Sequence, residues 1–222
     1  MAKKSNPELN YLPLTFACTT IVLFLGFFVL GLATDFGRSF TTESYRRRQI
    51  DQQPADIPNL FLVNTSGNQE LLKDSIINDG RFVILDFFYT SCKTICISQA
   101  TIFDSLQAKI KSNNLEDQIR LVSISFDPEN DSVSAIKKYS QNVKADPKVW
   151  SILTLKSVQD LHLLLDNFGI YVIKIPPLND LDHNASLHLI DPKGKLIKIS
   201  SLENADELFL IANKKIRHDS LQ

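Results

Sequence analysis

The sequence predicts an α/β domain with a mainly parallel central sheet and helices on both faces, preceded by one membrane-spanning helix. From residue 60 onward, short apolar runs alternate with segments of helical periodicity, as in parallel sheets with crossover helices. The last two runs flank the turn sequence Asp191-Pro-Lys-Gly194, which predicts an antiparallel hairpin. An uncharged apolar stretch near the amino terminus predicts the membrane helix.

The overall composition hides an uneven distribution of charge. The 222 residues contain 24 Lys+Arg and 25 Asp+Glu, but the first 48 carry six basic and only three acidic side chains. The remainder is mildly acidic, which argues against a nucleic-acid-binding protein with a concentrated basic face. Three cysteines are too few for a disulfide-stapled mini-domain, so we expect any cysteine chemistry to be local.

Residues 11–34 form the apolar stretch, in which 17 side chains are hydrophobic and none is charged. About 20 apolar residues span the hydrocarbon core of a bilayer, and this run exceeds the apolar part of a cleaved secretory signal. We therefore predict a transmembrane anchor at 11–34, after a short cytoplasmic segment at 1–10. Cys18 lies within the run, where we expect a membrane-buried thiol rather than a site of lipid attachment.

A tether follows the predicted anchor. Residues 35–59 are polar, include Pro54 and Pro58, and lack a sustained apolar period. The remaining residues, 60–222, suffice for one domain.

The basic residues that flank the anchor leave its orientation open. Lys3 and Lys4 precede it, whereas Arg38 and residues 46–48, all arginine, follow it. A simple count of these residues favours a cytoplasmic domain. We expect the three consecutive arginines to contact anionic lipid headgroups or solvent.

Apolar runs predict the strands of the domain. The strongest is Phe82–Tyr89, which is interrupted only by Asp86 and is typical of strands buried on two faces. Ile119–Phe126 is a second strong strand. Further strands are expected at 60–63, 148–153, 187–190 and 196–199.

Helical spacing of apolar residues predicts the helices. One follows Cys92 and ends at the Asn113-Asn114 pair, and another begins near Ser132, with Asp131 or Ser132 as its cap. Two more are expected at 157–168 and 205–216. The order of three strand–helix units, a hairpin and a last helix is a thioredoxin-like plan.

Two cysteines lie where the strongest strand gives way to a helix, in Phe87-Phe-Tyr-Thr-Ser-Cys92-Lys-Thr-Ile-Cys96. Residues four apart share one helix face, so both sulfurs could reach a single atom. The helix amino terminus and Lys93 both favour thiolates, which bind soft metals and attack disulfides. The alternative is that both cysteines are small core residues; the C-x-x-C spacing of disulfide oxidoreductases is not present.

Four histidines could complete a metal site. His162 lies in a predicted helix, where a core or surface role is the usual one, and His218 lies near the carboxy terminus. His183 falls in a polar loop just before a strand, and His188 lies in that strand. Two thiolates and an imidazole favour Cu(I) or Zn, and three ligands rather than four favour copper.

The domain resembles the Sco/SenC family of copper-binding, thioredoxin-like proteins involved in cytochrome c oxidase assembly. The resemblance covers about residues 60–215, with matching blocks in the family's order. These blocks are YTSCKTIC at 89–96, SISFDPENDS at 123–132, VWSILT at 149–154, FGIY at 168–171 and HNASLHLIDPKG at 183–194.

The resemblance implies a ligand set for copper. Carried over residue by residue, the ligands are Cys92, Cys96 and His183, whereas His188 falls at a position that is not a ligand. Asp127 matches an acidic position near the family's site, where it supports the ligands or, equally, forms a cap or turn. Ile97 replaces the proline that usually follows the second cysteine, and this loss removes a pre-set helix start but no donor atom.

The resemblance also implies a location. Family members have an amino-terminal anchor and a domain outside the cytoplasm, and we follow that topology over the arginine count because long trailing domains translocate despite flanking charge. No Arg-rich amphipathic leader precedes the anchor, which favours the bacterial inner membrane and periplasm over the mitochondrial inner membrane.

Three functions are compatible with these residues. The preferred one is a copper metallochaperone, a carrier rather than an enzyme, that supplies the copper-site subunit of cytochrome c oxidase. Its other expected partners are a periplasmic copper donor, a thiol reductant and membrane lipid. The second is a thiol-disulfide oxidoreductase that uses Cys92 and Cys96 as a redox-active pair and keeps the oxidase cysteines reduced. The third is a redox or copper sensor.

Overall fold

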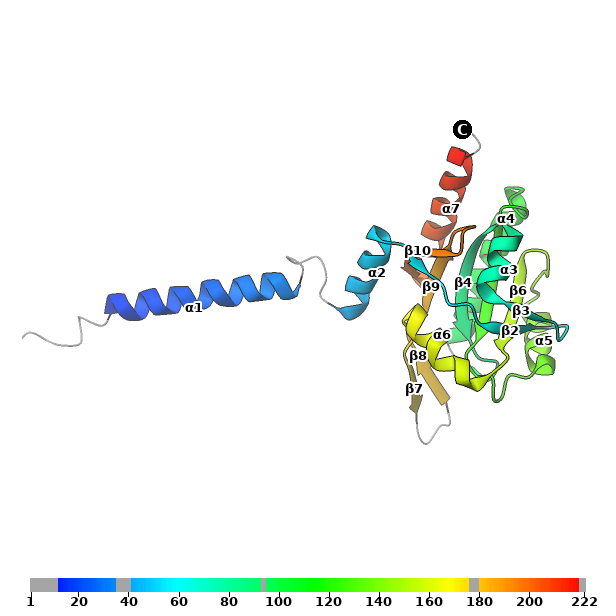
Figure 1. Cartoon of the computed structure of the whole chain (residues 1–222), viewed down its shortest axis with the longest axis horizontal. Helices are drawn as coiled ribbons and strands as arrows, with labels where there is room; N and C mark the ends of the chain where they lie inside the picture. The colour runs from blue at the N-terminus through cyan, green and yellow to red at the C-terminus, as the bar shows by residue number, and fades with distance from the viewer. Residues whose placement is uncertain (1–11, 35–40, 93–94, 176–179, 220–222) are drawn as a thin grey trace, which may run out of the picture. The chain divides into compact units, whose positions relative to one another are not determined.

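The computed structural model describes residues 12–34, 41–92, 95–175 and 180–219 (Figure 1). The chain divides into two compact units, Met1–Arg48 and Gln49–Gln222. Among the described residues, every buried hydrophobic side chain belongs to the second unit, beginning with Ile50. The hydrophobic core therefore lies wholly within this second unit.

The first unit contains α1 (Leu12–Ala33), the helix expected from the apolar run. Residues Pro13–Ala33 have a mean hydropathy of 2.4 and are long and apolar enough to cross a membrane. Large apolar side chains such as Phe16 and Phe24 are 78% and 74% exposed, as a lipid-facing surface requires.

A second helix, α2 (Thr42–Gln52), lies in the segment where we expected an irregular tether. Reciprocal hydrogen bonds of 3.1 Å hold its start, because Ser44 N–H donates to Thr41 Oγ1 and Thr41 N–H donates to Ser44 Oγ. Arg47 Nε donates to Glu43 at 2.8 Å one turn earlier. Polar capping and an ion pair thus form this helix, so apolar periodicity could not reveal it.

The second unit is built on one large sheet, with its strands in the order β1-β10-β9-β4-β5-β6-β2-β3. These strands are β1 (Ala55–Asp56), β2 (Phe61–Asn64), β3 (Gln69–Leu71), β4 (Phe82–Phe88), β5 (Ile119–Ser125), β6 (Trp150–Leu155), β9 (Ser186–Ile190) and β10 (Lys195–Ser201). The central β4, β5 and β6 run parallel, and the other neighbours in this sheet pair antiparallel. The predicted α/β fold is confirmed, but the sheet is mixed rather than mainly parallel, because antiparallel strands extend both of its edges.

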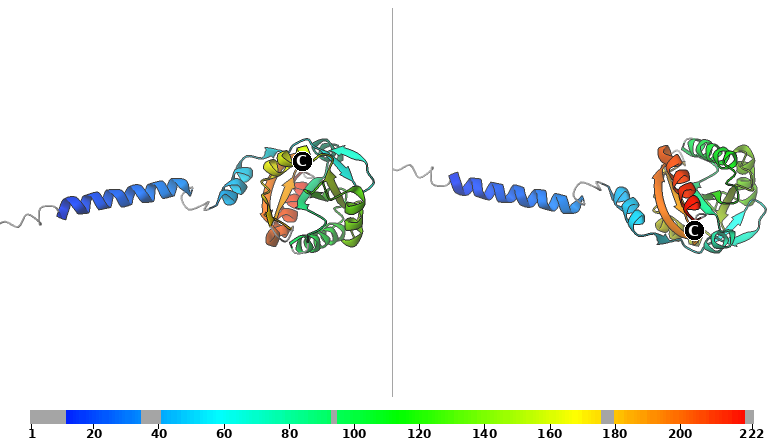
Figure 2. Two further views of the ribbon diagram at one scale, coloured as in Figure 1. Left: turned by 90° about the horizontal axis from the view of Figure 1, so that it is seen from below. Right: turned by 90° about the horizontal axis from the view of Figure 1, so that it is seen from above.

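Helices cover both faces of this sheet (Figure 2). They are α3 (Leu72–Asp79), α4 (Ile95–Ser112), α5 (Val133–Asn142), α6 (Leu161–Phe168) and α7 (Ala205–Asp219). Two consecutive β4 side chains identify the faces, because neighbours on a strand point in opposite directions. Phe88 stacks on Tyr139 of α5 with ring centroids 4.3 Å apart, whereas Phe87 packs on Phe168 of α6 at 5.1 Å. Thus α5 and α6 cover opposite faces of the sheet.

The segment just before residue 60 belongs to this unit rather than to a tether. Ile50 and Ile57 are buried, and Asp51 accepts a hydrogen bond from Lys198 Nζ at 2.9 Å. Strand β1 pairs with β10, with Ala55 opposite Leu196. The compact unit therefore begins about ten residues earlier than the apolar pattern indicates, at Gln49.

A small separate hairpin follows α6. It consists of β7 (Val172–Ile175) and β8 (Asp180–His183), which pair antiparallel. The expectation that His183 lies in a loop is therefore wrong: His183 is the last residue of β8. This strand, Asp-Leu-Asp-His, has one apolar residue among four, so no alternating pattern identifies it in the sequence.

Candidate metal centre

The first predicted ligand, Cys92, lies on the segment that leaves β4. Its N–H donates to the main-chain oxygen of Tyr89 at 3.2 Å, which closes a turn directly after the strand. The side chain is half-buried and packs against the hydrophobic core. Cys96 lies in the first turn of α4, as expected, but its side chain is outside the described part of the structure.

The predicted histidine ligand, His183, is held at the same end of the sheet. Its side chain is buried, and its ring packs edge-on against Phe126, the residue after β5, with centroids 4.9 Å apart. Phe126 also packs against Tyr89 at 5.4 Å.

A hydrogen-bonded pair fastens the β8 hairpin to the end of β4. Tyr89 Oη donates to the main-chain oxygen of Leu181 at 3.0 Å and accepts from its N–H at 3.3 Å. Leu181 is two residues before His183, and Tyr89 is three residues before Cys92. The two predicted ligands therefore lie on segments that Tyr89 joins directly.

The other histidines have different surroundings. His188 is fully buried in β9, where its ring meets the Phe87 and Phe168 rings edge-on and its Nε2 lies 3.1 Å from the main-chain oxygen of Phe168. His162 is exposed and pairs with Asp166 at 3.0 Å, and His218 is exposed near the end of α7. His188 thus packs within the core.

Asp127 occupies a turn. Its carboxylate oxygens accept hydrogen bonds from Asn130 Nδ2 at 3.0 and 2.9 Å, and its main-chain oxygen accepts from Asp131 N–H at 2.8 Å. These bonds favour the turn role over direct support of a metal ligand.

Sequence reasoning missed the role of Asp131, four residues later. Its side chain is buried and accepts hydrogen bonds from Thr90 N–H at 2.9 Å, from the Thr90 hydroxyl and from the Ser125 hydroxyl. Burial raises the pKa of this carboxyl, although the three hydrogen bonds act in the opposite direction. Asp131 resembles a helix cap in the sequence, but Ser132 caps α5 by accepting from Ala135 N–H. No sequence signal separates the two roles.

A second buried carboxyl lies in β4, six residues before Cys92. Asp86 is 2% exposed and hydrogen-bonds with Ser123 on the neighbouring strand β5. Ser123 Oγ in turn accepts from Trp150 Nε1 at 2.9 Å. Burial raises the pKa of Asp86 to about 7.

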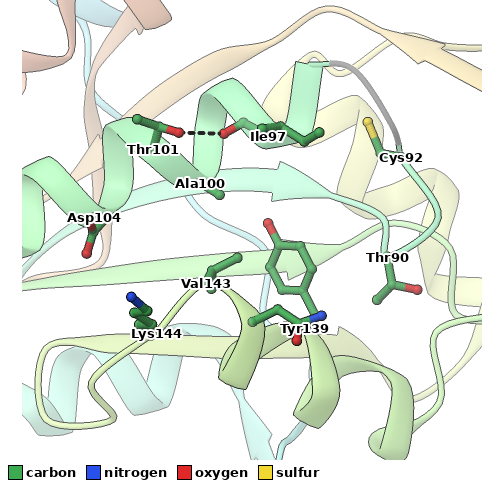
Figure 3. A pocket seen from close by; sticks show the side chains of 10 residues that line it. Thr90, Cys92, Ile97, Ala100, Thr101, Asp104, Tyr139, Val143 and Lys144 are labelled. Carbon is green, nitrogen blue, oxygen red and sulfur yellow. Dashed lines mark hydrogen bonds between the residues drawn. The ribbon is translucent and has the colours of Figure 1, made fainter.

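A cavity of about 450 Å³ opens between α4 and α5 beside Cys92 (Figure 3). Its lining residues are Thr90, Cys92, Ile97, Ala100, Thr101, Asp104, Tyr139, Asn142, Val143 and Lys144. Ile97, which lines the cavity at the position where the resemblance implies proline, is 62% exposed. The sulfur of Cys92 can therefore be approached from this side.

The predicted donors suit a soft metal ion. Thiolates and a neutral imidazole are donors that favour Cu(I) or Zn over Mg or Ca. Among the side chains that the structure describes, which exclude that of Cys96, no three His, Cys, Asp or Glu lie close enough to hold a metal ion. The structure thus describes the side chains of two predicted ligands, Cys92 and His183, but not that of Cys96.

Comparison with known proteins agrees with the resemblance to the Sco/SenC family. The SCO1/SenC family model matches residues 51–216. The SCO1 protein homolog of Bacillus subtilis is 31% identical over 138 residues, which cover 61% of this chain and 70% of that protein.

Solved structures show the same similarity. Copper-bound ScoI of Arabidopsis thaliana has a TM-score of 0.62 at 25% identity, over 74% of this chain and 99% of that one. BsSco, described as a member of the Sco family of cytochrome c oxidase assembly proteins with a disulfide switch, has a TM-score of 0.61 at 29% identity. That match covers 73% of this chain and 94% of BsSco.

Proposed function

The chain belongs to the SCO1/SenC family, and on this premise we propose that it is a membrane-anchored copper carrier for the assembly of cytochrome c oxidase. Copper is its cargo, held by the thiolates of Cys92 and Cys96 and the imidazole of His183. The recipient is the copper-site subunit of the oxidase, whose dinuclear site needs copper delivered in a controlled form.

One observation carries this proposal. The Tyr89 hydroxyl makes two hydrogen bonds to Leu181, so the segment bearing Cys92 and the hairpin bearing His183 are fastened together. A thiol-disulfide reductase needs only the two cysteines, whereas a metal site with an imidazole ligand needs this connection. A buried histidine at the end of β8, fastened to the segment that bears Cys92, is therefore better explained by metal binding.

Transfer of copper requires that the recipient's ligands reach the ion. The cavity beside Cys92 provides an approach, so incoming thiolates can replace the protein's ligands one at a time without releasing the ion to water. Thiolate ligation needs reduced cysteines, so a thiol reductant is a necessary partner in an oxidising compartment. A periplasmic copper donor completes the expected set of partners.

The proposed location follows from α1. With α1 as a single membrane anchor in the bacterial inner membrane, the copper-binding unit lies in the periplasm. Protease added to intact spheroplasts should then remove the domain. Cleavage only after lysis would contradict this orientation.

A second function is favoured by the half-buried, approachable sulfur of Cys92 and by the disulfide switch described for BsSco. In that case Cys92 and Cys96 act as a dithiol that reduces the cysteines of the oxidase copper site.

Copper titration of the reduced fragment 49–222, which holds the whole core, separates the two functions. His183→Ala should weaken copper binding by roughly 100-fold or more, because even groups that only support metal ligands contribute 10- to 100-fold. Cys92→Ser and Cys96→Ser should do the same, and the exposed His162→Ala is the matched control. If the unaltered fragment binds no copper against a weak chelator but reduces disulfides, the reductase function replaces the carrier function.

A further inference from the structure

The turn before Cys92 is held by a residue far from it in sequence. Thr90 is tied to Asp131 twice, through its N–H at 2.9 Å and through its hydroxyl. In Figure 3 the Thr90 hydroxyl points away from the cavity that Cys92 lines. The bonds to Asp131 therefore leave the cavity side of this segment free for an incoming partner.

The carboxylate of Asp131 also reaches the next strand. Its second oxygen, which accepts from Thr90 N–H, accepts from the Ser125 hydroxyl as well, and Ser125 Oγ accepts from Asp127 N–H at 3.1 Å. One buried carboxylate thus connects the ends of β4 and β5. Burying a carboxylate is unfavourable unless hydrogen bonds compensate, so the position of this group needs a reason beyond helix capping.

We propose that Asp131 is a positioning residue for Cys92. Asp131 holds Thr90 by hydrogen bonds, and the neighbouring residue Tyr89 is hydrogen-bonded to Leu181 in the β7–β8 hairpin that bears His183. Only one residue then separates the anchored Thr90 from Cys92, so the sulfur is held in place relative to the histidine before any metal arrives. The consequence for copper rests on the proposed function, whereas the positioning itself does not.

Two substitutions of Asp131 distinguish a positioning role of its side chain from a role of its negative charge. Asn at position 131 can accept from Thr90 N–H with its oxygen and donate to the Thr90 hydroxyl with its amide, because a hydroxyl can reverse its role. Ala removes every acceptor and leaves Thr90 N–H without its partner. If positioning is the function, Asp131→Asn should retain most of it and Asp131→Ala should lose it.

The first test uses the metal-free, reduced full-length chain in detergent micelles. In Asp131→Ala, hydrogen exchange of the peptide containing Thr90 should accelerate by roughly tenfold or more, because the amide loses a charge-assisted hydrogen bond. Alkylation of Cys92 by iodoacetamide, followed by mass spectrometry, should change by roughly twofold or more as the sulfur moves. Asp131→Asn should stay near the unaltered chain in both measurements.

A matched control separates local positioning from general loss of stability. Asp146 also accepts a main-chain hydrogen bond, from Lys148 N–H at 3.0 Å, but it precedes β6 at the opposite end of the sheet. Asp146→Ala should leave Thr90 exchange and Cys92 alkylation unchanged. If Asp131→Ala does not fold, Thr90→Val removes only the hydroxyl bond and should show the same effects in smaller size, with Thr90→Ser as its conservative counterpart.

The second test measures copper affinity of the same variants by chelator competition. We expect Asp131→Ala to bind about tenfold more weakly and Asp131→Asn to bind within about threefold of the unaltered chain. The positioning role is overturned if Asp131→Ala alters Thr90 exchange and Cys92 alkylation no more than Asp146→Ala does. Equal copper affinity of these two variants would overturn its consequence for copper binding. Absence of copper binding in the unaltered chain would instead refute the carrier function and leave the exchange and alkylation results to decide the positioning role.

Discussion

The buried carboxyl of Asp86 should make the stability of the second unit depend strongly on pH. The substitution that isolates this effect is Asp86→Asn, which resembles the protonated carboxyl in shape and can still bond with Ser123. Among the described residues, one Asp86 oxygen has no hydrogen-bond partner, and the protein around it offers no positive charge to offset ionisation. The folded protein therefore favours the neutral form.

The sign and size of the effect follow from the two pKa values. Burial raises the pKa of Asp86 from 3.8 to about 7, so between these values the folded state binds a proton that the unfolded state has released. The contribution of Asp86 to stability is thus greatest below about pH 4 and falls as pH rises to about 7. A difference of about three pH units corresponds to about 4 kcal/mol in the free energy of unfolding.

Urea unfolding of the reduced fragment 49–222 at several pH values between about 4 and 8 measures this loss. The unaltered fragment should lose about 4 kcal/mol relative to Asp86→Asn across that range. Comparing the two proteins at each pH removes the contributions of all other titrating groups. Parallel stability curves for the two proteins would show that Asp86 ionises normally and would refute the reasoning.

Three further outcomes are expected. Gly194→Ala should lower the free energy of unfolding by about 1 kcal/mol or more, measured in urea, because φ is +73° and the new Cβ would lie 3.2 Å from Lys73 Cγ. His188→Ala should leave copper affinity unchanged in chelator competition, yet destabilise the fold by about 3 kcal/mol through loss of a buried ring. Lys195 and Lys73 lower the pKa of Asp56 to about 2, so the stability from these ion pairs is present above about pH 4 and lost as pH falls through about 2. NMR titration of Asp56 should show this low midpoint, and roughly 1 M salt should move it upward.

The central strands were predictable because buried strands are rich in apolar residues, which the sequence shows directly. All seven residues of β4 and all seven of β5 are buried. In the sequence β4 is an apolar run broken only by Asp86, whereas β5 has four apolar residues among three polar ones. The predicted hairpin of β9 and β10 also forms, with Gly194 at its turn. By contrast, α3 buries only Leu72 and Ile76, and a helix with two inward side chains has no recognisable period.

The candidate site was predictable in its residue types but not in its support. Cysteine and histidine side chains are metal donors in any fold, so Cys92, Cys96 and His183 could be proposed as ligands from the sequence. Their role as ligands stays a proposal. The connections made by Tyr89 and Asp131 depend on which side chains face one another across strands distant in sequence. Tyrosine and aspartate are common in any domain, so nothing in the sequence distinguished these two.

The hydrogen bonds between Tyr89 and Leu181 join residues 92 positions apart. Contacts of such long range carry the entropic cost of closing a long loop, and chains that depend on them fold slowly. A chain that has only begun to fold presents its cysteines without the histidine, and as bare thiols in an oxidising compartment they are open to oxidation. Under the proposed function, maturation of this protein therefore has a required sequence: export, completion of the fold, and only then loading with metal.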